Sequence, residues 1–162
     1  HCHVMKRLFV CALVLLTLTS CGGQSVESEA RWPSVSVIDS SGTEINTDDL
    51  LTGNTLVVSL WSTWCVPCRR ELPQLQEFAA EHHDVSVVAV NLGDKLDSVA
   101  AYAQEIGLTM PVVIDTEGRI SSALGVTSVP STLVIDSSGK VIATHVGEIT
   151  ADELAVLVET SN

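Results

Sequence analysis

The sequence predicts an α/β domain in which helices flank a mixed central sheet. Apolar, β-branched runs of strand length alternate with stretches whose apolar residues recur at helical spacing, which is typical of parallel strands joined by helical crossovers. Towards the C-terminal end, two strand-like runs are joined by a short loop that contains glycine, and this predicts an antiparallel hairpin. With 162 residues, the chain has the length of one compact domain.

We expect six strands, at residues 34–38, 55–61, 85–91, 112–115, 132–136 and 141–146. The runs at 55–61 and 85–91 are apolar almost throughout, which is typical of strands that are covered on both faces. The first strand alternates polar and apolar residues and is followed by a turn at 39–42 that contains serine and glycine. The loop of the closing hairpin is expected at residues 136–140.

We expect helices at residues 66–81, 96–106 and 150–158, and a short helical segment at 121–124. Pro73 lies inside the first helix and should kink it near Arg69, because the proline ring crowds that carbonyl. Gly107 is placed to end the second helix. Thr150 and Glu153 have the spacing of a capping box at the start of the last helix.

Residues 1–20 have the organisation of a leader with a signal peptide. The basic residues Lys6 and Arg7 precede an apolar run at 8–16, which is too short for a membrane-spanning helix. The segment 18–21 reads Leu-Thr-Ser-Cys and resembles the bacterial lipobox. This resemblance implies that Cys21 becomes the lipid-modified first residue of an extracytoplasmic protein held at a bacterial membrane. An ordinary secretory signal with a chance cysteine is the alternative.

After the signal peptide we expect a lipidated tether at 21–32 and a folded domain at 33–162. Residues 22–30 are small and polar without periodicity, which is typical of a flexible linker. The formal net charge of −12 excludes nucleic acid as a partner, because no basic patch could neutralise phosphates. Anionic lipids also repel an acidic protein, so membrane attachment would depend on the lipid at Cys21.

The chain has five cysteines, and the predicted processing accounts for three of them. Cys2 and Cys11 would leave with the signal peptide and Cys21 would be lipidated, so only Cys65 and Cys68 remain as thiols. They form a Cys-x-x-Cys motif between the most apolar strand and the next helix. A helix N-terminus stabilises a thiolate, and a second thiol one turn later can attack a mixed disulfide at the first. The motif predicts a redox-active disulfide in which Cys65 attacks and Cys68 resolves, with no other cofactor.

Three other interpretations of the motif fit the sequence less well. Half of a zinc site would require a second Cys or His pair, and His82 and His83 are adjacent rather than spaced as zinc ligands. A purely structural disulfide would close too small a loop to stabilise the fold much. Two inert helix cysteines do not account for the tryptophan before them or for the export signal. We therefore expect no metal site and place His82, His83 and His145 at the surface.

The segment around the motif resembles a known active site. Residues 61–73 read Trp-Ser-Thr-Trp-Cys-Val-Pro-Cys-Arg-Arg-Glu-Leu-Pro and look like the active-site segment of the thioredoxin-like TlpA/ResA group of bacterial thiol–disulfide oxidoreductases. The resemblance extends over about residues 33–159. It implies a thioredoxin-like fold with an N-terminal strand extension and an inserted βα element at about residues 91–110.

A second segment, Ser-Val-Pro-Ser-Thr at 128–132, resembles the loop that carries the cis-proline of thioredoxin folds. The resemblance implies a cis bond between Val129 and Pro130 beside the cysteines, with the Val129 backbone pairing with an extended substrate segment. X-Pro is the only linkage in which a cis bond costs little. From the residues alone, Pro130 could equally begin an edge strand. We expect Trp64, Val129 and Pro130 to contact the substrate.

Two positions near the motif bear on proton transfer. Thioredoxin has a buried Asp six residues before its first cysteine, whereas this chain has Ser59 there, which cannot act as the proton acceptor. ResA-like proteins use a Glu three residues after the second cysteine, and this position is Glu71. A carboxylate there could take the Cys68 proton or raise the thiol pKa by like-charge repulsion. The alternative is a solvated helix residue beside Arg69 and Arg70.

These features predict a membrane-anchored, extracytoplasmic thiol–disulfide oxidoreductase that reduces cysteine pairs in client proteins and is renewed by a membrane thiol reductant. The resemblance implies clients such as the haem-binding cysteine pair of an apocytochrome c or the cysteine pair of a copper site. One alternative is a peroxiredoxin-like peroxidase, in which Val58 would occupy the usual proline position and Ser62 the threonine-like one. The other is a lipoprotein that only binds metal or another ligand through the dithiol.

Overall fold

The computed structural model describes residues 29–161, so the predicted signal peptide, Cys21 and most of the tether lie outside the described residues. The elements in chain order are β1 (Ser36–Asp39), β2 (Glu44–Asn46), the 3-10 helix η1 (Thr47–Leu50), β3 (Thr55–Trp61), α1 (Val66–Glu81), β4 (Val85–Asn91), α2 (Leu96–Glu105), β5 (Val112–Ile114), α3 (Arg119–Ala123), β6 (Ser131–Ile135), β7 (Val141–Val146) and α4 (Ala151–Ser161). No helix in this part of the chain is long and apolar enough to cross a membrane.

The seven strands of residues 29–161 form one mixed sheet in the order β2-β1-β5-β4-β3-β6-β7. β3, β4 and β5 are parallel neighbours, while β6 and β7 continue the sheet beside β3 as antiparallel strands. On the other side, β1 is antiparallel to β5 and to β2. The predicted α/β class, with a parallel section and a closing hairpin, is confirmed. The loop after β3, which leads to Cys65 and the start of α1, therefore lies at the edge where the parallel strands end.

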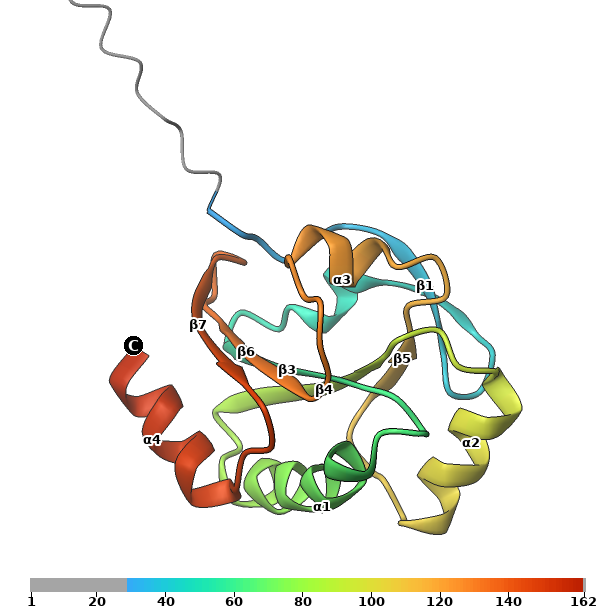
Figure 1. Ribbon diagram of the computed structural model, residues 1–162. Helices are drawn as coiled ribbons and strands as arrows, with labels where there is room; N and C mark the ends of the chain where they lie inside the picture. Colours follow the sequence, from blue (N-terminus) through green and yellow to red (C-terminus); the bar gives the residue numbers. More distant parts are fainter. Residues whose placement is uncertain (1–28, 162) are drawn as a thin grey trace, which may run out of the picture.

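Helices cover both faces of the sheet (Figure 1). α1, α2 and α4 lie on one face, and α3 lies on the other face with the N-terminal segment. Successive residues of β3 point to opposite faces, so Val57 belongs to the core under α1 whereas Leu56 and Val58 belong to the core under α3. The continuous apolar run in β3 follows from this double coverage.

The N-terminal part of the fold differs from the prediction in two respects. The strand β2 and the helix η1 were not expected, because three residues give no readable pattern and β2 is held by pairing with β1. The fold also begins before residue 33, since Trp32 is buried and its Nε1 donates to the Thr47 carbonyl at 2.9 Å. Burial of a large aromatic side chain stabilises the fold, so Trp32 belongs to the folded part of the chain rather than to the predicted tether.

α1 is one helix of 16 residues that runs through Pro73. Pro73 has no N–H to donate to the Arg69 carbonyl, and this carbonyl instead accepts a hydrogen bond of 3.2 Å from the Tyr102 hydroxyl of α2. The Arg69 guanidinium also lies over the Tyr102 ring, 4.5 Å from its centroid. The segment at 91–110, predicted as part of an inserted βα element, contains α2 and thereby supports the first turn of α1.

The capping box at the start of α4 is confirmed. The Glu153 N–H donates to Thr150 Oγ1 at 3.3 Å, and the Thr150 N–H donates to Glu153 Oε2 at 2.9 Å. These reciprocal hydrogen bonds satisfy two N–H groups that the helix leaves without internal partners. They fix the point at which the chain enters α4, directly after the loop that follows β7.

Candidate active site

The cysteine motif lies where β3 ends and α1 begins, as predicted. Cys65 is the N-cap residue of α1, and its Sγ accepts a hydrogen bond of 3.2 Å from the Cys68 N–H. Pro67 occupies the first turn, where its missing N–H needs no partner. The helix N-terminus and the Cys68 N–H together favour negative charge on Cys65 Sγ, which is the state that attacks a disulfide.

Cys65 and Cys68 form a disulfide, with 5.3 Å between their Cα atoms. Cys65 is 4% exposed and Cys68 is 1% exposed, so both sulfur atoms belong to largely buried residues. The neighbouring apolar side chains are far more open, because Trp64 is 71% exposed and Val66 is 62% exposed. Because these two exposed residues flank Cys65, a client can approach Cys65 more easily than Cys68. This favours Cys65 as the cysteine that attacks a client and Cys68 as the cysteine that resolves.

The peptide bond between Val129 and Pro130 is cis, as the resemblance implied. Pro130 is buried, and the half-buried Val129 packs against the core cluster that contains both cysteines. The Pro130 carbonyl accepts a hydrogen bond of 2.9 Å from the Gly147 N–H, which joins the loop before β6 to the loop after β7. Because β6 lies between β3 and β7, the edge-strand alternative for Pro130 is wrong.

Glu71 is 1% exposed, so the alternative of a solvated helix residue is wrong. It follows Cys68 by three residues on α1 and therefore lies on the same face of the helix. Its Oε1 accepts hydrogen bonds from Ser59 Oγ at 3.0 Å and from Thr132 Oγ1 at 3.2 Å. Its Oε2 accepts one from the Ile149 N–H at 3.2 Å. Burial raises the pKa of Glu71, and these hydrogen bonds oppose the rise only in part, which makes the carboxyl a better proton acceptor than one in water.

Sequence reasoning identified Ser59 only as the residue in place of an acid, and it missed Thr132 and Ile149. Ser59 and Thr132 are direct partners in the β3–β6 register, so their side chains lie on the same face of the sheet. The sequence feature that could have revealed this contact is a hydroxyl residue inside each of two apolar strands, since buried hydroxyls require hydrogen-bond partners. Ile149 contributes only its backbone N–H, and no side-chain pattern marks such a contact.

A second group that sequence reasoning missed holds the loop before Cys65. Asp94 Oδ2 accepts hydrogen bonds from the Thr63 N–H at 2.6 Å and from Asn91 Nδ2 at 2.9 Å. The Asp94 N–H donates to Asn91 Oδ1 at 2.8 Å. Asn91 is fully buried at the end of β4, next to β3, so this network fixes the approach to the motif from the neighbouring parallel strand. The sequence feature that could have revealed this network is Asn91, a polar residue at the end of an apolar strand.

Comparison with known proteins gives the family. The sequence pattern of the Redoxin family matches residues 27–159. The chain belongs to the Redoxin family. The thiol-disulfide oxidoreductase ResA of Bacillus subtilis is 30% identical to this Redoxin protein, over 90% of this chain and 88% of its own length. ResA of Geobacillus thermodenitrificans is 34% identical over 67% of this chain, and this match spans only 63% of that relative.

Solved structures agree with this assignment. StoA from Bacillus subtilis is 26% identical, with a TM-score of 0.67 over 79% of this Redoxin chain and 98% of its own. DsbF from Mycobacterium tuberculosis is 27% identical, with a TM-score of 0.71 over 80% of this chain and 96% of its own. The thioredoxin-like fold is therefore confirmed, and this Redoxin protein is similar to the ResA thiol–disulfide oxidoreductases.

The histidines and carboxylates of the Redoxin protein do not form a recognisable metal site in the described residues. Within residues 29–161, no group of three or more His, Cys, Asp or Glu side chains is placed to hold a metal ion. His82 and His83 follow the C-terminal end of α1, at the opposite end of that helix from the cysteines. The His82 ring stacks on Phe78, with 4.2 Å between the ring centroids.

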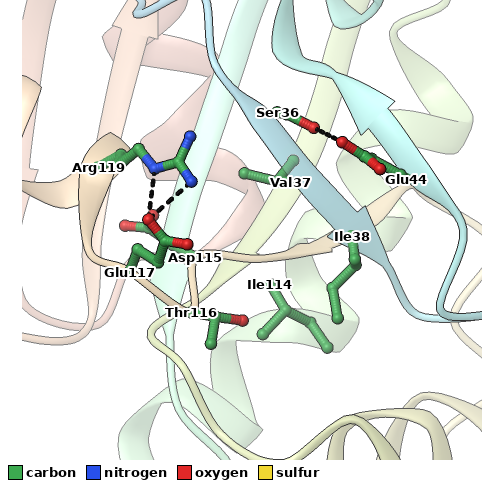
Figure 2. A pocket seen from close by; sticks show the side chains of 9 residues that line it. All are labelled: Ser36, Val37, Ile38, Glu44, Ile114, Asp115, Thr116, Glu117 and Arg119. Carbon is green, nitrogen blue, oxygen red and sulfur yellow. Dashed lines mark hydrogen bonds and ion pairs between the residues drawn. The ribbon is translucent and has the colours of Figure 1, made fainter.

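Figure 2 shows a pocket between β1, β2 and the segment that follows β5. Most of its charged and polar side chains already have partners, since Glu117 pairs with Arg119 and Ser36 donates to Glu44. Asp115 accepts hydrogen bonds from two N–H groups at the start of α3. None of the predicted site residues lines this pocket, and we assign no chemistry to it.

Proposed function

We propose that this Redoxin protein is an extracytoplasmic, lipid-anchored enzyme that reduces cysteine pairs in client proteins. The buried carboxyl of Glu71 carries the proposal, because it lies on the same face of α1 as Cys68. A structural disulfide needs no proton acceptor, whereas a buried thiol that must become a thiolate during exchange does. The hydrogen-bonded position of Cys65 at the helix N-terminus supplies the other requirement, a stabilised attacking thiolate.

Reduction of a client begins at Cys65. In the dithiol form, the Cys65 thiolate attacks one sulfur of the client disulfide. A bond forms between Cys65 Sγ and that sulfur, the client S–S bond breaks, and the second client sulfur leaves as a thiolate. Trp64, Val129 and Pro130 are the residues we propose to contact the client at this step, with the Val129 backbone pairing with an extended client segment.

Cys68 then resolves the mixed disulfide. Glu71 takes the proton of Cys68 Sγ, the resulting thiolate attacks Cys65 Sγ, and the first client sulfur leaves. The client gains two electrons in total, and the protein ends with the Cys65–Cys68 disulfide. A membrane thiol reductant would return the pair to the dithiol form for the next cycle.

The location and the clients are supported by the sequence. Cys21, outside the described residues, follows a signal-peptide pattern and would carry the lipid. The resemblance to the TlpA/ResA group supports clients with the haem-binding cysteine pair of an apocytochrome c or the cysteine pair of a copper site. In both client classes, a disulfide between the two cysteines must be reduced to thiols before the metal group is bound.

Trapping with Cys68→Ser in the full chain tests the proposed activity. Without the resolving thiol, Cys65 should remain joined to its clients, and non-reducing gels with mass spectrometry should identify adducts that a reductant releases. Cys65→Ser is the matched control and should form none. No adducts in Cys68→Ser, together with no disulfide reductase activity in the wild type, would overturn the proposal. Peroxide consumption that depends on Cys65, in the absence of adducts, would favour the peroxidase alternative.

The anchor is tested separately. Cys21→Ser should move the protein from the membrane fraction to the soluble extracytoplasmic fraction of bacteria that express the full chain. Disulfide reductase activity should be retained, because Cys21 precedes the described fold. Metabolic labelling with a fatty acid should mark the wild type and not this variant. Equal membrane retention and no labelling of the wild type would overturn the lipid anchor.

A further inference from the structure

One peptide group connects the imidazole of His145 with the carboxyl of Glu71. His145 Nε2 lies 3.3 Å from the Glu148 carbonyl oxygen. A carbonyl oxygen only accepts hydrogen bonds, so Nε2 carries the proton in this contact. The N–H of the same peptide group belongs to Ile149 and donates to Glu71 Oε2 at 3.2 Å. The imidazole and the carboxyl therefore bind opposite sides of a single amide.

The fold holds this arrangement in place. His145 is the direct partner of Thr132 in the β6–β7 ladder, so its side chain lies on the face of the sheet where Thr132 contacts Glu71. The loop that carries the shared amide is fixed to the cis-proline, because the Gly147 N–H donates to the Pro130 carbonyl. Glu71 is buried whereas His145 is half-buried. Water and protons therefore reach the unit formed by Glu71, the Glu148–Ile149 peptide group and His145 from the side of the imidazole.

The other charged groups around this unit come from α1, from α4 and from the loop between β7 and α4. Arg70 of α1 donates through Nε to the Glu148 carboxylate at 3.0 Å, which balances that negative charge locally. Glu153 of α4 lies within electrostatic reach of His145. The contacts that β3 and β6 make with the Glu71 carboxyl are neutral hydroxyls. His145 is thus the titratable cation placed to act on Glu71 in this part of the described chain.

We propose that His145 is a positioning residue that sets the charge state of Glu71 through the Glu148–Ile149 peptide group. The inference rests on the proposed role of Glu71 as the proton acceptor for Cys68. A protonated imidazole polarises the amide, strengthens the hydrogen bond to Glu71 Oε2 and places positive charge near the carboxylate. His145 thereby determines the lowest pH at which Cys68 can resolve a mixed disulfide.

The direction of the effect follows from the surroundings of the carboxyl. Burial raises the pKa of Glu71, whereas its three hydrogen bonds and the positive charge of His145 oppose that rise. Without the imidazolium, the pKa of Glu71 rises further, and the carboxyl is already neutral at a pH where it would otherwise accept a proton. A neutral imidazole lacks this positive charge, so His145 acts on Glu71 in this way only when the imidazole is protonated.

The test is the pH dependence of the resolving step in the full chain. The reduced protein reacts with an aromatic disulfide that releases one coloured thiolate when Cys65 attacks and a second when Cys68 resolves. The rate of the second release should fall at low pH, and we call this part of the pH profile the acid limb. We expect His145→Gln to move the acid limb to higher pH by about half a unit to one unit. Resolution should therefore slow several-fold at about pH 6 and change little at about pH 8. His83→Gln, which removes an exposed histidine far from Glu71, should match the wild type.

Glu71→Gln separates this inference from the proposed function. If Glu71 accepts the proton, this variant loses the acid limb, and adding His145→Gln changes nothing further. A Glu71→Gln variant that resolves as fast as the wild type overturns the proposed function. A limb that depends on Glu71 but does not shift in His145→Gln overturns the role of His145 alone. Carboxyl ¹³C titration of Glu71 gives a second measurement, and an unchanged titration in folded His145→Gln and His145→Ala also overturns it.

Discussion

Ser59 Oγ on β3 donates a hydrogen bond to Glu71 Oε1 on α1 at 3.0 Å. Ser59 occupies the position of the buried Asp of thioredoxin, and here it stabilises the carboxylate of Glu71 instead. Both residues are 1% exposed. The Thr132 hydroxyl donates to the same carboxyl oxygen. Two neutral donors from the sheet thus favour the charged form of a carboxyl that burial would otherwise keep protonated.

Replacement of this carboxyl should affect resolution rather than attack. Glu71→Gln keeps the size of the side chain but cannot accept a proton, so we expect the mixed disulfide at Cys65 to persist about 100-fold longer at neutral pH. The initial attack should remain within a few-fold of the wild type. Acid quenching and mass spectrometry of the mixed disulfide with a client peptide measure both steps.

Glu77→Gln is the matched control for this prediction, because Glu77 is an exposed glutamate on the same helix. It should resolve the mixed disulfide at the wild-type rate. Equal lifetimes of the mixed disulfide in wild type and Glu71→Gln would remove Glu71 from the reaction.

A second carboxyl at residue 59 should make the protein less stable as the pH rises. In Ser59→Asp, two buried carboxyls share one space and their repulsion raises the pKa of at least one of them, so the folded state binds a proton more tightly than the unfolded chain. The free energy of unfolding of this variant, relative to the wild type, should therefore fall as pH rises through the raised folded-state pKa. Urea denaturation across this range measures the difference.

Ser59→Ala serves as the control, because it removes a hydrogen bond without adding a carboxyl. It should lower the free energy of unfolding by about 1 kcal/mol, and this loss should change much less with pH. A loss in Ser59→Asp that does not vary with pH would show that the two carboxyls do not interact.

The sequence predicted those parts of the site that local chemistry determines. Cys65 caps α1 because the helix begins at the next residue, and this boundary is visible in the change of periodicity after β3. Thr150 and Glu153 cap α4 because their spacing alone allows the reciprocal hydrogen bonds. Such features need no knowledge of distant residues.

The burial of Glu71 could not be derived in this way. The two residues before it, Arg69 and Arg70, are exposed, so the local pattern also fits a solvated helix residue. Burial depends on how α1 is rotated against β3 and β6, and this rotation is determined by residues distant in sequence, including Ser59 and Thr132. The role of the Ile149 backbone was invisible for the same reason.

Trp64 should contribute to client binding rather than to the chemistry of Cys65. Because it is 71% exposed, Trp64→Ala should leave the melting temperature unchanged. We expect kcat/KM for a peptide client to fall about tenfold, while the reaction with a small aromatic disulfide stays near the wild-type rate. Val156→Ala is the control, since Val156 is an exposed apolar residue on α4. An equal loss with both substrates would indicate that Trp64 acts on the reactivity of Cys65.

The Tyr102 hydroxyl should stabilise α1 only because Pro73 interrupts its hydrogen bonds. Tyr102→Phe removes the donor to the Arg69 carbonyl and should lower the free energy of unfolding by about 1 kcal/mol. Pro73→Ala supplies a backbone N–H for the same carbonyl, so Tyr102→Phe should cost much less in that background. Urea denaturation of the wild type, both single variants and the double variant gives the coupling energy, which we expect to exceed about 0.5 kcal/mol. An equal cost of Tyr102→Phe in both backgrounds would mean that the hydroxyl does not compensate for the proline.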